Sequence, residues 1–507
     1  MTDVPVPVAE LVRDGSTGVP VPRYDRSRVQ VGIVHVGVGG FHRSHEAVYV
    51  DELLARGQTQ WGICGVGTQP GDRAIADVLR AQDGLYTLVV RHPDGRREPR
   101  VVGSIVDHLY APDDPEAVVE RMAAPSTRIV SLTITEGGYQ VDPATGVFVP
   151  TDPAVLLDLS AGGGLRTVFG LVTEALARRR ARGTAPFTVL SCDNVQGNGD
   201  VARAAFAGFA QRRDADLGRW VRDRVAFPNS MVDRITPGTT DADRAQLRED
   251  VGVDDGWPVV CEPYLQWVLE DAFCDGRPPW EQVGVQLVPD VRPYELMKLR
   301  LLNAGHQALG HLGSLAGHRY ADEACSDPVL RAFLLAYMEH EATPTLDPVP
   351  GVDLAAYRSS LVERFSNAHV RDTLARLRAE TSDRIPTFLL PVVRAQRATG
   401  GPFSRCALVV AAWAHGLQGV DDHGRELEVV DRLRDVLVAA AAAQQDDPTA
   451  FVRRSGVMSP TRNPSSCFRT ATSLPSSAAT RSSRWRTVTA FSSLPSEMRK
   501  TSSGLFS

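Results

Sequence analysis

Residues 31–45 read VGIVHVGVGGFHRSH, and this stretch decides the fold of the chain. Val31 to Val36 form an apolar run of strand length, which ends at the glycine-rich turn Gly37-Val38-Gly39-Gly40. An amphipathic helical pattern follows from Phe41 to Arg56. A strand, a glycine turn and a helix in this order are typical of dinucleotide-binding folds, because glycines let the backbone approach a pyrophosphate and the helix N-terminus offers N–H groups. His42 stands where the usual third glycine would be, so an ordinary tight turn remains the alternative.

A second strand is predicted at Trp61 to Gly67, WGICGVG, and Asp72 is the nearest acidic residue after it. A carboxylate at this strand end commonly binds the ribose hydroxyls, and it favours NAD over NADP because it repels a 2′-phosphate. Asp72 lies farther from the glycines than the usual spacing of about 20 residues, and Arg73 follows it. A surface aspartate in a turn is therefore the competing interpretation.

Strands and helices alternate through the first half of the chain. Further strands are expected at 86–91, 100–110, 128–135 and 187–191, and helices at 165–182 and 198–213. The first two of these strands would form a hairpin around the turn sequence HPDG. Such alternation implies a mainly parallel sheet, whose ligands bind beyond the carboxyl ends of the strands. Glu136 and Asn194 each follow a predicted strand, so we expect them at the same sheet edge as the glycine turn.

Tyr294 to Gly313, YELMKLRLLNAGHQALGHLG, has the leucine spacing of a helix. At about 100° per residue, Glu295, Lys298, Asn303 and His306 fall within one arc of roughly 140°. A carboxylate, an amine, a carboxamide and an imidazole on one face can carry out proton chemistry. A solvated polar face is the alternative, since such faces are common.

The pattern divides the chain into three parts. We predict a Rossmann-like, parallel-sheet domain at 1–289, which includes a lead-in at 1–30, and a mostly α-helical domain at 290–452. Residues 227–237 in the first part are expected to be irregular. A tail at 453–507 is rich in Ser, Thr, Arg and Pro and lacks hydrophobic periodicity. Two hypotheses fit this tail: a disordered basic segment, or a frameshift near residue 453, which resequencing would test.

Composition narrows the class of protein. The chain has 507 residues, with 43% hydrophobic and 23% charged residues and a net charge of −6, which disfavours nucleic acid or an anionic membrane as a partner. No apolar run reaches the roughly 18 residues of a membrane span, and we see no secretory signal. The seven cysteines are scattered and form no CxxC pair. A cytoplasmic protein without a thiolate zinc site is expected.

Six segments of the chain resemble the polyol-specific long-chain dehydrogenases. They are GVGGFHRSH at 37–45, WGICGVG at 61–67, TEGGY at 135–139, CDN at 192–194, FPNSMVDRITP at 227–237 and KLRLLNAGH at 298–306. The resemblance covers roughly residues 30 to 450, and Lys298, Asn303 and His306 match the family signature Lys-x4-Asn-x2-His. It implies NAD-dependent oxidation of a sugar alcohol to a ketose, with D-mannitol to D-fructose as the expected reaction, by an enzyme that is metal-independent and usually monomeric.

The resemblance also implies roles for individual residues. Lys298 would be the general base, Asn194 and Asn303 would hold the substrate oxygen, and His306 would orient the substrate. Residues that match family positions for proton movement or substrate contact are Glu136, Glu295, Asp233, Arg376 and Arg384. We expect NAD to contact Val36, Gly37, Val38, Gly39, Gly40, Phe41, His42 and Asp72.

Several alternatives stay open at this point. A zinc-dependent alcohol dehydrogenase would draw its ligands from His42, His45, His306 and His311, but no cysteine cluster supports it. A non-catalytic NAD sensor is another possibility. Within the family, a hexuronate reductase acting on fructuronate or mannonate and a D-arabinitol dehydrogenase remain. A carboxylate substrate should need an extra cation, which Arg371 or Arg376 could supply.

Overall fold

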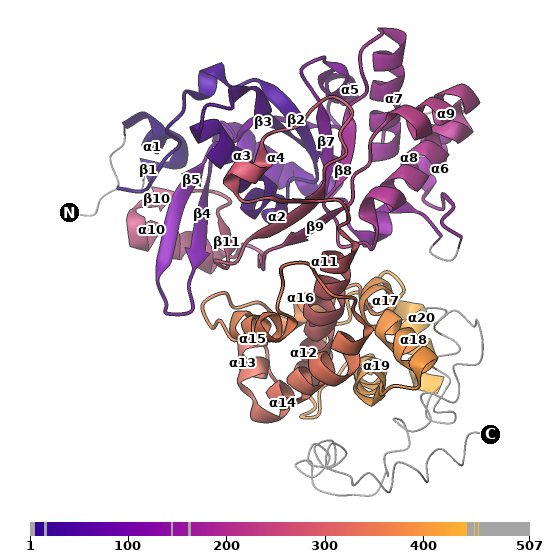
Figure 1. Ribbon diagram of the computed structural model, residues 1–507. Helices are drawn as coiled ribbons and strands as arrows, with labels where there is room; N and C mark the ends of the chain where they lie inside the picture. The colour runs from indigo at the N-terminus through magenta and orange to yellow at the C-terminus, as the bar shows by residue number, and fades with distance from the viewer. Residues whose placement is uncertain are drawn as a thin grey trace, which may run out of the picture. The chain divides into compact units, whose positions relative to one another are not determined.

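The computed structural model describes residues 6–14, 18–142, 145–160 and 164–443, together with Phe451 and Ser455. The chain divides into two compact units, Met1–Leu296 and Met297–Ser507 (Figure 1). The domain limits at 1–289 and 290–452 stay predictions. The atypical tail expected from residue 453 lies outside the described residues, apart from Ser455.

The first unit is built on a five-stranded parallel sheet with the strand order β6-β3-β2-β7-β8 (Figure 1). Its strands are β2 (Val31–Val36), β3 (Gly62–Gly67), β6 (Ile105–Tyr110), β7 (Ile129–Leu132) and β8 (Thr188–Ser191). Both faces of β2 are buried, and its residues alternate between two cores. Val34 and Val36 pack on the side of α5 (Pro115–Ala123), α7 (Val168–Ala181) and α8 (Asn198–Arg213), whereas Ile33 packs on the side of α3 (Glu46–Ala55). The predicted α/β fold with a parallel sheet is confirmed.

Three smaller sheets complete the strands of this unit. The first contains β11 (Val259–Cys261), β4 (Tyr86–Arg91) and β5 (Arg97–Val102). The second contains β13 (Gln286–Val288), β12 (Gln266–Glu270) and β9 (Ser230–Asp233). The third pairs β1 (Val6–Pro7) with β10 (Val253–Asp254). The other helices are α1 (Val8–Asp14), α2 (Gly40–Ser44), α4 (Arg73–Ala81), α6 (Pro153–Leu159), α9 (Ala215–Arg224) and α10 (Asp241–Val251).

Two strand predictions in this unit were wrong. Residues 100–110 are not one strand but parts of β5 and β6, which lie in different sheets. The chain bends between them because Gly103 donates its N–H to Asp51 Oδ1 at 2.9 Å and Ser104 Oγ donates to the carbonyl of Ala47 at 2.7 Å. Residues 227–237 are not wholly irregular, since β9 pairs antiparallel with β12 there. Both outcomes depend on long-range partners that local pattern does not contain.

The second unit is helical. Beyond α12 (Ala304–Leu315) its α-helices are α13 (Ala321–Ser326), α14 (Pro328–Tyr337), α15 (Leu354–Phe365), α16 (Leu374–Arg378), α17 (Thr381–Arg384), α18 (Leu390–Thr399), α19 (Ser404–Gly416) and α20 (Arg434–Ala442). Every residue of α12 is buried, and α13, α14, α16 and α19 pack against it (Figure 1). Gly313 allows the close approach, because a Cβ there would lie 2.8 Å from that of Ala324. No helix among the described residues is long and apolar enough to span a membrane.

The helix predicted at 294–313 is not a regular α-helix. It consists of α11 (Arg292–Met297), a π-helical segment at Lys298–Asn303 and α12. The α-helical step of 100° does not hold in the π-helical segment, so the predicted polar arc is distorted there. Glu295, Lys298 and His306 are only 5%, 6% and 8% exposed, which excludes a solvated polar face. Single π-helical turns within α-helices are frequent at functional sites.

Candidate active site

Gly37 shapes the glycine turn that follows β2. Its φ is +97°, and a Cβ added there would lie 2.1 Å from the carbonyl oxygen of Thr133. The carbonyl oxygen of Gly37 accepts hydrogen bonds from Thr133 Oγ1 at 2.6 Å and from the Gly39 N–H at 2.7 Å. A Cβ on Gly39, by contrast, would have no atom nearer than 3.9 Å. The turn is therefore packed against the sheet at Gly37 and open at Gly39, as a turn that admits a pyrophosphate requires.

His42 replaces the third glycine of the usual motif and points into the core. Its side chain is 1% exposed and its ring stacks on that of His35, with centroids 3.4 Å apart. Burial lowers the pKa of His42 to about 3, so its imidazole is neutral. The side chain of His42 is thus buried away from any cofactor at the glycine turn. The helix predicted at 41–56 also breaks here, into α2 and α3, at the non-helical backbone of His45.

Glu46 lies beneath the glycine turn and was not anticipated from the sequence. Its carboxylate accepts a hydrogen bond from Ser131 Oγ at 2.8 Å, and Oε2 lies 3.1 Å from His35 Nδ1 and 3.3 Å from His42 Nδ1. Burial alone would raise the pKa of Glu46, but the facing nitrogens of His35 and His42 outweigh it and hold the pKa below its ordinary value. A buried carboxylate whose hydrogen-bond donors are in place makes the structure beneath the glycine turn more rigid.

We expect Glu46→Gln to lower the free energy of unfolding by about 1.5–3 kcal/mol, because hydrogen bonds to a charged acceptor are lost. Urea unfolding at neutral pH measures this. Since folding lowers the pKa of Glu46, its contribution is present above the ordinary glutamate pKa of about 4.3 and is lost as the pH falls below it. The matched control is Glu52→Gln on the same helix, whose exposed pair with Arg100 should be worth less than about 1 kcal/mol. Equal effects of the two substitutions would contradict the prediction.

His35, His42 and Glu46 are also the one group of three potential metal ligands that lie together among the described residues. The Nδ1 atoms of both histidines face Glu46 Oε2, and the two imidazole planes are stacked at 12° to each other. His45 is another of the histidines considered for zinc. Its Nε2 donates a hydrogen bond to the carbonyl of Gln266 at 2.8 Å. Burial lowers the pKa of His45 to about 4.

Asp72 holds the turn after β3. Its Oδ2 accepts hydrogen bonds from the N–H groups of Thr68 at 2.9 Å and Gln69 at 2.8 Å. Arg73, which follows Asp72, pairs with Asp113 at 2.6 Å and lies 4.3 Å from the centroid of the Tyr110 ring. The contact of Asp72 with ribose stays a prediction.

The carboxyl ends of β7 and β8 are joined by Asp193, which sequence reasoning missed. Its carboxylate accepts hydrogen bonds from the N–H of Ile134 at 3.0 Å, the N–H of Thr135 at 2.9 Å and the hydroxyl of Tyr139 at 2.7 Å. The loop that contains Glu136 is thereby fixed to the residue preceding Asn194. Asp193 and Asn194 are adjacent in the CDN motif, which was the available signal.

Glu295 and Asp233 also belong to the first unit. Glu295 Oε1 accepts a hydrogen bond from the N–H of Gly197 at 2.8 Å, at the start of α8. This contact ties Glu295 to the segment that follows Asn194, which is half-buried. Asp233 is the last residue of β9 and is 2% exposed. The structure thus connects Glu295 with the segment that follows β8, and its role in a site stays a prediction.

The π-helical segment of the second unit carries Lys298 at its first position and Asn303 at its last. Tyr337 donates its hydroxyl hydrogen to the carbonyl of Arg300 at 2.7 Å and so anchors the segment. Asn303 Oδ1 is buried and has no hydrogen-bond partner among the described residues. A buried polar atom without a protein partner needs an explanation, and a bound ligand is one of several. His306 packs on the ring of Phe365, with centroids 4.4 Å apart.

Two of the predicted arginines lie near a buried carboxylate, Asp372. Arg376 Nε donates to Asp372 Oδ1 at 2.6 Å, and Nη2 donates to Oδ2. Arg384 Nη1 donates to the carbonyls of Arg376 at 3.0 Å and Leu377 at 3.2 Å. Asp372 was missed from the sequence, although its spacing of four residues from Arg376 is that of a helical ion pair.

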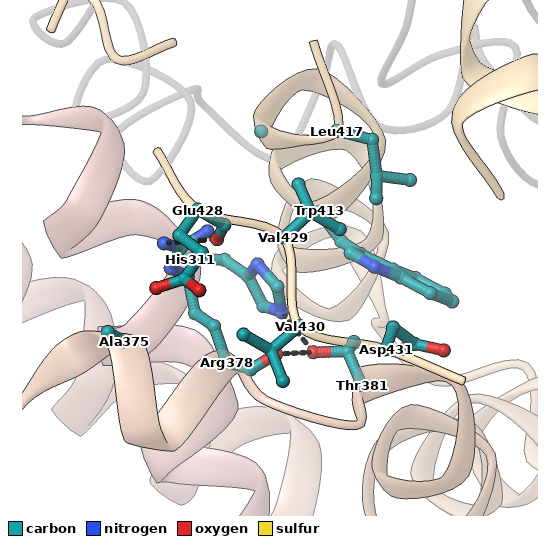
Figure 2. A pocket seen from close by; sticks show the side chains of 11 residues that line it. His311, Ala375, Arg378, Thr381, Trp413, Leu417, Glu428, Val429, Val430 and Asp431 are labelled. Carbon is teal, nitrogen blue, oxygen red and sulfur yellow. Dashed lines mark hydrogen bonds between the residues drawn. The ribbon is translucent and has the colours of Figure 1, made fainter. Parts of the chain in front are cut away.

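A small pocket in the second unit contains none of the predicted site residues except the zinc candidate His311 (Figure 2). His311 Nε2 lies 3.3 Å from Thr381 Oγ1, which donates to the carbonyl of Arg378 at 2.6 Å. Burial lowers the pKa of His311 to about 3. Because these lining side chains hydrogen-bond within the helical unit, we interpret the pocket as a gap in the packing of that unit.

Two domains of one known family match successive parts of the chain. The mannitol dehydrogenase Rossmann domain matches residues 31–282, and the mannitol dehydrogenase C-terminal domain matches residues 290–468. The chain belongs to the mannitol dehydrogenase family. The second match extends into the atypical tail, whose origin stays a hypothesis.

Relatives in the mannitol dehydrogenase family cover most of the chain. A mannitol 2-dehydrogenase of Aspergillus fumigatus is 46% identical over 452 residues, which are 88% of this chain and 90% of that protein. The structure of Pseudomonas fluorescens mannitol 2-dehydrogenase in ternary complex with NAD and D-mannitol is 46% identical, with a TM-score of 0.83, and the match covers 86% of this chain and 88% of that one. A substrate-free D-sorbitol dehydrogenase is 39% identical, with a TM-score of 0.79 and coverage of 92% and 96%. The predicted resemblance to polyol dehydrogenases is confirmed.

Proposed function

We propose that this protein oxidises D-mannitol to D-fructose with NAD as the hydride acceptor and Lys298 as the general base. The observation that carries the proposal is the π-helical segment, which carries the buried Lys298 at its first position and Asn303, whose amide can donate N–H groups, at its last. Support also comes from the related Pseudomonas enzyme, whose structure contains NAD and D-mannitol. The chemistry of alcohol oxidation requires both a base and donors for an oxyanion.

The glycine turn suits a dinucleotide, since the backbone at Gly39 is open while Gly37 is packed. The residues proposed to hold NAD are Val36, Gly37, Val38, Gly39, Gly40, Phe41, the backbone of His42, and Asp72. When bound, NAD accepts the hydride from the carbinol carbon. Every other part of the reaction is assigned to side chains of this chain.

Lys298 is proposed to take the hydroxyl proton of the substrate. A lysine is a base only when neutral, so its pKa must fall from about 10.4 toward the working pH. Burial of Lys298, at 6% exposure, acts in that direction, because desolvation disfavours the ammonium. Glu295 and Glu136 are proposed to pass the proton to solvent. No metal is needed for these steps.

Asn194 and Asn303 are proposed to hold the oxygen that becomes an alkoxide. We expect Asn194→Ala and Asn303→Ala each to lower kcat for D-mannitol by about 10²–10³, because preorganised donors act mainly on the transition state. The double variant should lose less than the product of the two factors, since both amides serve one oxygen. Steady-state kinetics with saturating NAD measures this. A loss confined to KM would contradict the proposed role.

His306 is proposed to orient the substrate, and Asp233, Arg376 and Arg384 to contact its other hydroxyl groups. The test of the function is a panel of D-mannitol, D-sorbitol, D-arabinitol and D-mannonate, each with NAD and NADP. We expect the highest kcat/KM for D-mannitol with NAD. If no polyol produced NADH, a non-catalytic sensor would be favoured instead. A monomeric, cytoplasmic protein remains our expectation.

A further inference from the structure

The ion pair between Asp372 and Arg376 joins a buried carboxylate to a partly exposed guanidinium. Asp372 is 5% exposed by its side chain, whereas that of Arg376 is 40% exposed. Two parallel N–H groups of the guanidinium, Nε and Nη2, face the two carboxylate oxygens. Nη1 of Arg376 has no hydrogen-bond partner among the described residues. The outer N–H groups of Nη1 and Nη2 therefore remain available to a ligand, while Asp372 neutralises the charge of Arg376.

The other charged groups around Asp372 are His306 and Arg384. Burial would raise the pKa of Asp372, but Arg376 outweighs it, with smaller effects of His306 and Arg384, and the pKa is lower than usual. Arg384 is turned toward the carbonyls of Arg376 and Leu377. Asp372 thus lies among three groups that can carry a positive charge.

Arg371, the other cation considered for a carboxylate substrate, is also engaged. Its guanidinium lies 3.9 Å from the centroid of the Tyr320 ring. Interaction with Tyr320, and with Asp322 and Glu323, raises its pKa above the ordinary value. Each of the two arginines therefore lies near a carboxylate of this chain.

We propose that Asp372 determines substrate class: by neutralising Arg376 and adding a negative charge beside it, it favours uncharged polyols and disfavours hexonates. This inference rests on the proposed function, in which Arg376 contacts the substrate. A hydroxyl group can accept a hydrogen bond from a neutralised Arg376, whereas a carboxylate is bound strongly only where a positive charge is left uncompensated. The Asp372 carboxylate also repels a second carboxylate nearby.

Asp372→Asn tests this, with kcat/KM for D-mannonate and D-mannitol measured on the same preparation with NAD. The ratio of the two values, mannonate over mannitol, should rise by about tenfold or more, since a like-charge contact is removed. The ratio is independent of the fraction of enzyme that folds. If turnover is too low, calorimetric titration of D-mannonate into the variant and wild-type NADH complexes gives the same comparison, and tighter binding by the variant is expected.

Asp421→Asn is a matched control. Asp421 is 3% exposed by its side chain and pairs with Arg425, again four residues on and 59% exposed, at 2.7 Å. Asp421→Asn should leave the ratio of kcat/KM for D-mannonate over D-mannitol unchanged. Asp372→Glu keeps the negative charge, so its ratio should stay near that of the wild type. An unchanged ratio in Asp372→Asn, or wild-type enzyme that oxidises D-mannonate as well as D-mannitol, would overturn the inference. Wild-type enzyme inactive on every polyol would instead refute the proposed function.

Discussion

Replacing Lys298 with alanine is expected to lower D-mannitol oxidation by about 10⁴-fold, at the upper end of what a general base contributes. Lys298 is buried at the first position of the π-helical segment, and it is the proposed proton acceptor. NADH binding should be unchanged, because the glycine turn lies in the first unit. Stopped-flow or steady-state assays measure the rate, and NADH fluorescence titration measures cofactor affinity.

Lys298→Arg separates a base from a mere positive charge. Arginine keeps the charge but has a pKa above about 12, so it cannot lose its proton near neutral pH. We expect it to be as inactive as the alanine variant. A rate within tenfold of wild type for either variant would show that another group accepts the proton.

Replacing Gly37 with alanine should have the second largest effect, which is loss of NADH binding together with destabilisation. A Cβ would lie 2.1 Å from the backbone oxygen of Thr133, and φ is +97°. The backbone conformation alone costs an L-residue about 1–3 kcal/mol, and the clash with a main-chain atom adds to it. We expect the free energy of unfolding to fall by about 3 kcal/mol or more, measured by urea unfolding, and NADH fluorescence enhancement to be lost.

Gly39→Ala is the control for this prediction, since it lies two residues away and has room for a methyl group. Its φ is −89°, and the nearest atom to an added Cβ is 3.9 Å away. Stability should remain within about 0.5 kcal/mol of wild type. NADH affinity should still fall if the pyrophosphate approaches this backbone. Wild-type stability and NADH affinity in Gly37→Ala would show that the turn relaxes without cost.

The sequence by itself determined the main architecture. The predicted strand at Val31–Val36 and helix at Asn198–Arg213 match β2 and α8 residue for residue. Both have local causes: β2 is apolar at almost every position and buried on both faces, and α8 repeats apolar residues at helical spacing. The Lys-x4-Asn-x2-His signature likewise identified a family, because residue order alone carries that information.

Only the tertiary structure decided how the site residues are supported. The π-helical segment depends on backbone hydrogen bonds displaced by one residue, and leucine spacing does not reveal such a shift. Glu46, Asp193 and Asp372 acquire their roles from partners 85, 59 and 4 residues away. A carboxylate in a sequence is equally suited to solvent or to a buried network. Folding decides between them, because desolvating a charge is tolerated only where its donors are already in place.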